Sequence, residues 1–233
     1  MENRISILCT RPVSQEQLDE AATNSIDVDV LSFIEIAPIE TVEVQQEIES
    51  ALLRPTSVVF TSMNAVEAVS IFIDEQPGWK IYCMGNTTRL LAEKYFGEAA
   101  IAGTAQDATS LAELIVAEGE SDSVIFFCGD QRRDELPAIL NASDIEVEEV
   151  VVYETVPVPH KIKKEYLGIL FFSPSAVESF FSVNKIAPET KMFAIGKTTA
   201  DAIAERCNNK ILLPEQATKY SLVEKMLEYF SGY

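Results

Sequence analysis

The chain has 233 residues, which lies between one and two ordinary domains, and 47% of them are hydrophobic. That content is enough to bury a core in each of two small domains, so the composition excludes a disordered chain. Asp and Glu outnumber Lys and Arg by 37 to 18, which gives a formal net charge of −19. Because so acidic a surface repels a nucleic-acid backbone, we exclude DNA and RNA as partners.

The first residues do not have the pattern of a secretory signal. They start polar, and the apolar run Ile5–Cys9 is far shorter than the apolar region of a signal peptide. No apolar run in the sequence reaches the roughly 18 residues that span a bilayer. We therefore expect a soluble, cytoplasmic protein that does not enter a membrane.

The four cysteines and the single histidine, His160, are far apart in the sequence. Three of the cysteines lie in apolar stretches that look like buried strands, where a reduced thiol behaves as a small hydrophobe. Transition-metal sites need clustered Cys or His ligands. The pattern predicts neither a disulfide framework nor a metal site.

In chain order, short runs rich in β-branched and aromatic residues alternate with helical patterns of about a dozen residues. This alternation is typical of βα units and a parallel sheet. We predict strands over residues 5–9, 28–34, 57–60, 81–84, 99–102, 124–128, 147–153, 169–172, 192–195 and 211–213. Helices fill most of the gaps, including one over residues 15–22 and one after Gly129.

An internal repeat is the most informative feature of the sequence. Residues 57–67, SVVFTSMNAVE, align with residues 168–178, GILFFSPSAVE, so that Ser62 matches Ser173, 111 residues further on. The same offset aligns Gly85 with Gly196 and Ser110-Leu111 with Ser221-Leu222. Chance similarity rarely keeps register over about 60 residues, so the chain contains two copies of one α/β architecture.

The second copy lacks the last strand, helix and strand of the first. The segment 5–34 contains these three elements in the missing order, and its apolar faces need covering. We therefore infer a discontinuous α/β domain, residues 1–34 plus 157–233, and an inserted α/β domain, residues 38–150. Two hinge strands, residues 35–37 and 151–156, would join them.

Both hinge segments are extended in character and end in a proline, Pro38 or Pro157, which disfavours helix in the residue before it. We expect them to pair, so the predicted fold class is α/β, with two similar flavodoxin-like or Rossmann-like parallel-sheet domains on a two-stranded hinge. A small-molecule ligand in a cleft between such lobes would contact both of them.

Polar residues follow several predicted strands, where parallel sheets bind ligands and helix N-termini offer free N–H groups. They are Thr61, Ser62, Asn64, Gly85, Thr87, Thr88 and Gly129 in one copy, and Ser173, Ser175, Gly196, Lys197, Thr198 and Thr199 in the other. Helix capping, worth about 1 kcal/mol per residue, explains any single cluster better than ligand binding does. The clusters recur in both copies and contain no Asp or Glu, so we interpret them as contacts for an anionic ligand.

Basic residues also stand at the predicted strand or helix ends. Arg11, Arg132 and Lys197 are candidate partners for ligand carboxylates. Exposed ion pairs explain these residues equally well, as they do for Arg133.

Taken together, the motifs resemble the uroporphyrinogen-III synthase family, and the resemblance covers essentially the whole chain, although each motif alone is short. It rests on Thr10-Arg11-Pro12, Phe-Thr-Ser-x-Asn-Ala-Val at 60–66, Gly-x-Thr-Thr at 85–88, Gly129 with Arg132, Arg133 and Leu136, Tyr153, and Phe-Ser-Pro-Ser-Ala-Val at 172–177. Residues 194–199 and 214–222 extend it.

The resemblance implies a cytoplasmic enzyme of tetrapyrrole (heme) biosynthesis. Its substrate would be hydroxymethylbilane, a linear tetrapyrrole rich in carboxylates, which family members cyclise with inversion of ring D and loss of water. The resemblance implies no metal and no organic cofactor. We expect a monomer, with at most a transient contact to the preceding enzyme of the pathway.

Tyr153 matches the family's tyrosine at the end of the strand between the lobes. The resemblance makes it the candidate catalytic residue, as proton donor to the departing hydroxyl. A phenol carries its proton at neutral pH and adds no negative charge beside a polyanion. A tyrosine that only packs at a strand end explains the residue equally well.

Other classes of protein account for the sequence less well. A two-lobe binding protein without catalysis is the main alternative, although the missing signal sequence counts against a periplasmic receptor. Receiver-type signalling proteins need clustered acidic residues at strand ends with a partner lysine, which neither copy has. No Gly-x-Gly-x-x-Gly or phosphate-loop motif follows a predicted strand, which disfavours a nucleotide-dependent enzyme.

Overall fold

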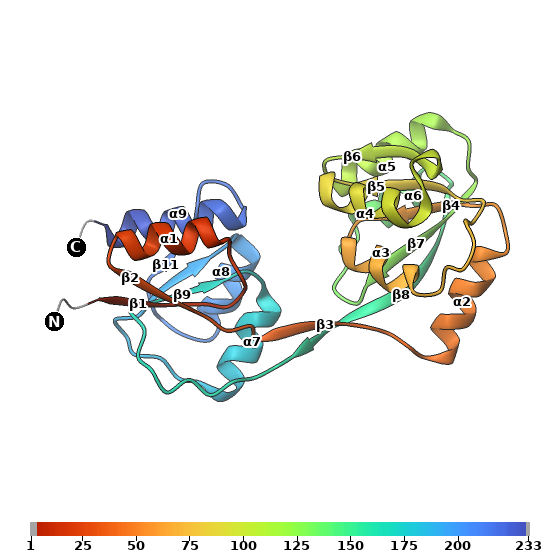
Figure 1. Ribbon diagram of the computed structural model, residues 1–233. Helices are drawn as coiled ribbons and strands as arrows, with labels where there is room; N and C mark the ends of the chain where they lie inside the picture. Colours follow the sequence, from red (N-terminus) through yellow and green to blue (C-terminus); the bar gives the residue numbers. More distant parts are fainter. Residues whose placement is uncertain (1–3, 232–233) are drawn as a thin grey trace. The chain divides into compact units, whose positions relative to one another are not determined.

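The computed structural model describes residues 4–231, which divide into two units, each with its own parallel sheet (Figure 1). Unit 1 contains the residues up to Glu35 and from Val156 onward, and unit 2 contains Ile36–Thr155. In unit 1 the strands are β1 (Ile5–Cys9), β2 (Ile26–Val30), β9 (Gly168–Phe171), β10 (Lys191–Ala194) and β11 (Ile211–Leu212). They lie in the order β11-β10-β9-β1-β2, and all neighbours are parallel.

Helices cover both faces of the unit 1 sheet, because its strands are apolar on both sides. On one face, α1 (Gln15–Thr23) and α9 (Lys219–Phe230) contribute Ala21 and Met226 to a core with Ile7 and Phe193. On the other face, α7 (Pro174–Val183) and α8 (Lys197–Ala204) pack against strand residues such as Phe171.

Unit 2 has a six-stranded sheet in the order β3-β8-β7-β4-β5-β6. Its strands are β3 (Ile34–Pro38), β4 (Ser57–Phe60), β5 (Lys80–Met84), β6 (Ile101–Ala105), β7 (Ser123–Gly129) and β8 (Glu146–Pro157). Strands β4 to β8 are mutually parallel where they pair.

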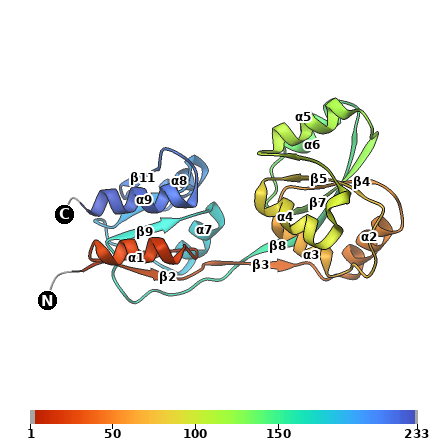
Figure 2. The ribbon, with the colours of Figure 1, turned by 45° about the horizontal axis from the view of Figure 1, so that its top comes forward.

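The unit 2 sheet is also covered on both faces (Figure 2). On one face lie α2 (Val42–Leu52), α3 (Met63–Ser70) and α4 (Asn86–Phe96), and on the other lie α5 (Ala108–Glu118) and α6 (Glu135–Ala142). Trp79 anchors the first face, because its indole N–H donates to the carbonyl of Ala51 at 2.9 Å while its ring contacts Phe96 and Phe127. An indole in this setting combines a large buried area with a satisfied donor.

The two sheets share one topology, entered at different points. In unit 2 the chain runs through β4, β5 and β6 on one side of the sheet and then crosses to β7 and β8. In unit 1, β9, β10 and β11 take the first three places, while β1 and β2 take the places of β7 and β8. The strand order and the parallel pairing confirm the predicted α/β class with two parallel-sheet domains.

The chain passes between the units within β3 and β8, which are neighbours in the sheet. The Ile39 N–H donates to the Val152 carbonyl, and the Val158 N–H donates to the Phe33 carbonyl, both at 2.9 Å. One residue number rises as the other falls, so these two segments are antiparallel.

Two predicted strands differ from the structure. Residues 28–34 are not one strand, because β2 ends at Val30 and β3 begins at Ile34, with Phe33 buried in the unit 1 core between them. Residues 98–100 form a 3₁₀ turn after Gly97, whose φ is +86°, so β6 begins only at Ile101. Among residues 4–231, no helix is long and apolar enough to cross a membrane.

The reactivity of the cysteine thiols tests whether the strands that carry them are buried. Burial raises the pKa of Cys9, Cys83 and Cys128 to about 11, whereas Cys207 is half-buried near the end of α8. Because the thiolate is the reactive form, we predict that at pH 8 a disulfide reagent such as DTNB reacts rapidly with at most one thiol per native chain. After unfolding, all four thiols should react.

The matched variant is Cys207→Ser, which should abolish the rapid phase and leave the slow one. Two or more rapidly titrating thiols in the native protein would contradict the burial of these strands.

Candidate functional site

The strand order reverses between β4 and β7 in unit 2, and between β9 and β1 in unit 1. At such a point the connections leave the sheet in opposite directions, so a crevice opens beyond the carboxyl ends of the strands. Thr61 and Ser62 directly follow β4, and Gly129 ends β7. Ser173 and Arg11 occupy the corresponding places in unit 1.

A cavity of about 450 Å³ lies at this point in unit 2, a volume within the range that holds small ligands. Five of the sequence-predicted residues line it together, namely Thr61, Ser62, Gly129, Arg132 and Tyr153. We call it the switch-point cavity. Asp107, Gln131, Arg133 and Glu135 supply its other charged or amide groups.

The first serines of two matching helices act as caps in the structure. The Ser62 hydroxyl accepts the N–H of Asn64, and the Ser173 hydroxyl accepts the N–H of Ala176, both at 3.2 Å. By contrast, α4 and α8 begin at Gly85 and Gly196 without a side-chain cap. Their first-turn N–H groups therefore keep the capacity to bind an anion.

The two Thr-Thr pairs divide in the same way in both units. Thr88 and Thr199 are buried, with Thr199 only 1% exposed, so their hydroxyls face protein rather than solvent. Thr87 and Thr198 are exposed on the first turns of α4 and α8, as Lys197 is. Of each pair, only the first threonine is accessible to a ligand.

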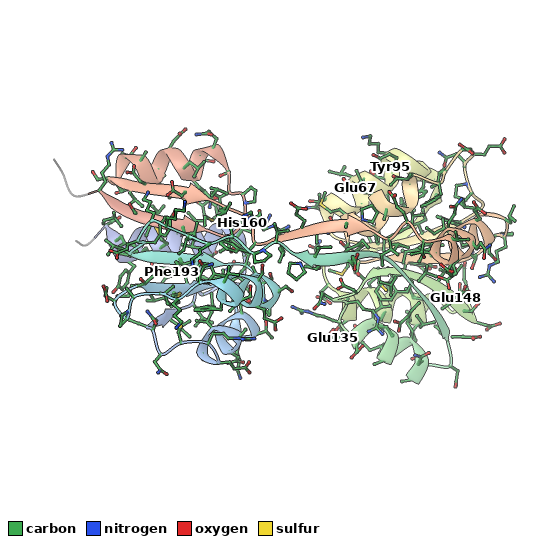
Figure 3. All side chains as sticks on the ribbon, turned by 90° about the horizontal axis from the view of Figure 1, so that it is seen from below. Glu67, Tyr95, Glu135, Glu148, His160 and Phe193 are labelled. Atoms are coloured by element: carbon green, nitrogen blue, oxygen red, sulfur yellow. The ribbon has the colours of Figure 1, made fainter. Side chains whose placement is uncertain are left out.

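Asn64 lies outside the switch-point cavity. It lines a smaller hollow of about 150 Å³ with Ile36, Glu67, Ile71 and Tyr153. Figure 3 labels Glu67 and Glu135, which line the two hollows from helices on opposite faces of the sheet. Tyr153 is half-buried and forms a wall of both hollows.

The basic residues of the switch-point cavity differ in their partners. The Arg132 guanidinium forms ion pairs with Asp134 and Glu149, which raise its pKa above the usual arginine range. Arg133 lines the same cavity and forms no ion pair with any carboxylate among residues 4–231. Arg133, which the sequence analysis set aside as a surface residue, is therefore the better-placed cation for an anionic ligand.

Acidic groups are nevertheless present in the cavity, contrary to the expectation drawn from the polar clusters alone. Asp107 precedes α5, and Glu135 is the first residue of α6. The Asp107 carboxylate accepts the N–H of Ser110 at 2.8 Å, and this hydrogen bond lowers the pKa of Asp107. It is a helix cap, and it occupies a helix N-terminus that an anionic ligand would otherwise use.

In unit 1, sequence reasoning overlooked Lys219, the first residue of α9. Burial and the neighbouring Arg11 lower the pKa of Lys219. The charge of Lys219 in turn offsets part of the rise that burial causes in the pKa of Cys9. Neither Arg11 nor Lys219 forms an ion pair in the described part of the chain. The one feature of the sequence that pointed to Lys219 was the repeat, which aligns Thr218 with Asp107, the residue that caps α5.

The described residues offer no group of three His, Cys, Asp or Glu side chains arranged to hold a metal ion. The geometry supplies two guanidinium groups and one phenol at the switch-point cavity and, separately, uncapped first-turn N–H groups at α4.

Fold and site together define a doubly wound α/β protein with a polar cavity at the carboxyl ends of its strands. The sequence model described as uroporphyrinogen-III synthase HemD matches residues 16–224. The chain therefore belongs to the uroporphyrinogen-III synthase family, the hydro-lyases of that name in porphyrin biosynthesis.

Two solved structures support the assignment of the fold. The Helicobacter pylori uroporphyrinogen-III synthetase superposes with a TM-score of 0.67 at 18% identity, covering 97% of this chain and 99% of that one. A mutant uroporphyrinogen III synthase from Thermus thermophilus gives 0.59 at 13% identity, covering 97% of both chains. At these identities the likeness concerns the fold.

The different partners of Arg132 and Arg133 generate a paired prediction. We expect Arg133→Gln to raise the KM for the carboxylate-rich substrate by about threefold to tenfold, because one free charge-assisted contact is worth about 1 kcal/mol. Arg132→Gln should change KM by less than twofold, since that guanidinium already has two carboxylate partners. Steady-state kinetics of the two variants, with thermal melts as a control for folding, would check this; the reverse ranking would contradict it.

The lowered pKa of Lys219 determines whether its charge favours or opposes folding. A lysine whose pKa is lower in the folded than in the unfolded chain opposes folding while it is charged, and this cost is relieved as pH rises through the folded pKa. Lys219→Met should therefore not reduce the melting temperature at pH 7, yet should raise KM.

The matched control is Lys225→Met on the same helix, whose ammonium is paired with Glu228 at 3.1 Å. Its KM should stay at the wild-type value. A marked loss of stability in Lys219→Met alone would show that the charge is structural.

Proposed function

We propose that this chain cyclises hydroxymethylbilane to uroporphyrinogen III, with Tyr153 as the proton donor. The observation that carries the proposal is the position of Tyr153 in the wall of the switch-point cavity, which Arg132 and Arg133 also line. Family membership supports the reaction, and the position of the phenol in the cavity wall supports the role of Tyr153 as the acid.

The reaction needs an acid that protonates the oxygen of the terminal hydroxyl group on ring A. The terminal C–O bond on ring A breaks as the hydroxyl takes a proton and leaves as water, and the electron pair of the pyrrole nitrogen stabilises the carbon left behind. Ring D then attacks this carbon through its substituted position, and rearrangement of the spiro intermediate inverts ring D before the macrocycle closes and loses a proton. Tyr153 supplies the first proton and recovers one from solvent.

The remaining residues hold the substrate. Unassisted closure gives the isomer in which ring D is not inverted, so the protein must favour a less probable folded geometry, and each tenfold bias requires about 1.4 kcal/mol. Carboxylates of the substrate bind the first-turn N–H groups at Gly85 and the Arg133 guanidinium in unit 2. Gly196, Lys197 and Arg11 provide the equivalent groups in unit 1.

The central prediction concerns the phenol. Tyr153→Phe keeps the ring that packs against the Val152 side of the core and removes only the hydroxyl. We expect the rate of cyclisation to fall by tenfold or more while the melting temperature stays within about 2 °C of wild type, because the substitution removes one hydroxyl and leaves the ring in place. A rate equal to that of the wild type would remove the acid role.

The assay also separates the enzyme from a two-lobe binding protein without catalysis. Substrate is generated in place by the preceding enzyme of the pathway, and the type III and type I products are separated by chromatography. With a catalyst, most of the product formed is the type III isomer. A protein that only binds the substrate leaves the isomer ratio of the spontaneous reaction unaltered.

A further inference from the structure

The ring of Tyr153 lies directly against the backbone of Gly129. A Cβ atom added to Gly129 would stand 2.3 Å from Cζ, 2.4 Å from Cε2 and 2.7 Å from Oη of Tyr153. Unbonded carbon atoms normally approach no closer than about 3.5 Å. The ring therefore occupies the space that any side chain at residue 129 would need.

Backbone conformation does not explain this glycine. Positive φ values occur at Gly85, Gly97 and Gly119, and Gly129 is not among them. Residue 129 thus has a backbone that other amino acids adopt, and what it requires is room for the ring.

A change of register between β7 and β8 sets the direction of the ring. Cys128 pairs with Val151, but Gly129 pairs with Tyr153, so β8 has one extra residue, Val152, at this step. Val152 is buried in the core on one face of the sheet. A bulge of this kind re-aims the side chain that follows it, which here is the phenol.

Asp130 holds the backbone around the same residue. Its N–H donates to the Tyr153 carbonyl at 3.1 Å, and its Oδ1 accepts the N–H of Thr155 at 3.0 Å. The backbone N–H and the side chain of Asp130 thus connect the loop after β7 to residues 153 and 155 of β8.

We propose that Gly129 and Asp130 are positioning residues that fix the Tyr153 ring, Gly129 by leaving space for it and Asp130 by bonding the strand on both sides of it. The consequence for catalysis rests on the proposed function, in which Tyr153 is the acid. Gly129 then acts through Tyr153, a role separate from the substrate contact that the sequence predicts for it.

The position of the ring can be measured without activity. The chain has seven tyrosines, so protein labelled with 3-fluorotyrosine gives seven fluorine resonances, and the one missing from Tyr153→Phe belongs to Tyr153. Gly129→Ala should shift this resonance and leave the other six in place. The matched control is Gly78→Ala, whose added Cβ would meet Pro55 at an ordinary 3.7 Å and should shift nothing at Tyr153.

Kinetics then test whether the position matters. Gly129→Ala should lower kcat by tenfold or more, with little change in KM, and should lower it by less than twofold when Tyr153 is already Phe. A loss of stability or of a substrate contact would instead reduce the rate by the same factor in both backgrounds. Asp130→Ala should lower kcat as well, whereas Asp130→Asn should restore it, because the amide oxygen still accepts the Thr155 N–H.

The outcomes separate the two claims. A Tyr153 resonance that stays in place in both Gly129→Ala and Asp130→Ala overturns the positioning role, and so does a shifted resonance with undiminished kcat while Tyr153→Phe is slow. A Tyr153→Phe enzyme of wild-type rate overturns the acid role alone, and the fluorine spectra still decide whether the ring is held. If Gly129→Ala does not fold, the Asp130→Ala and Asp130→Asn pair decides the matter.

Discussion

The pairing of β1 with β9 is the constraint on which the rest of the architecture depends. Cys9 lies opposite Leu170 in the sheet, and both the N–H and the hydroxyl of Thr10 donate to the Leu170 carbonyl. Because β1 takes the place that β7 has in unit 2, unit 1 is complete only when the chain returns to it. The intervening residues must therefore leave and re-enter unit 1, which they do in β3 and β8. The same pairing creates the reversal of strand order that puts Arg11 and Ser173 at neighbouring strand ends.

Sequence patterns predicted the elements best where a buried strand is bounded by polar residues. The ends of β1 and β4 were predicted correctly because Thr10 and Thr61 each follow three consecutive apolar residues. The continuous pattern over residues 28–34 was misleading, since Phe33 lies between the two strands and is buried in the unit 1 core, which extends the apolar pattern beyond the end of β2. Apolar periodicity records burial, and it does not record which sheet a strand joins.

The candidate site was predictable only in outline. The repeat indicated the strand ends where Thr61, Ser62 and Gly129 lie together in a cavity. It could not indicate that Glu149 on β8 neutralises Arg132, because that partner comes from a strand whose exposed face shows no motif. For the same reason Arg133 and Lys219 were undervalued. Local sequence predicts which backbone groups are free, whereas charge pairing depends on side chains brought together by the sheet.

The separation of Thr10 from Leu170 by 160 residues has a consequence for synthesis. A ribosome adding about 5–20 residues per second needs roughly 8–30 s to make the second strand after the first has emerged. During this interval unit 2, which is contiguous, can acquire its sheet, while β1 and β2 wait with an unpaired apolar edge of the kind that invites association with other chains. The nascent N-terminal segment is thus the natural place for a chaperone to act.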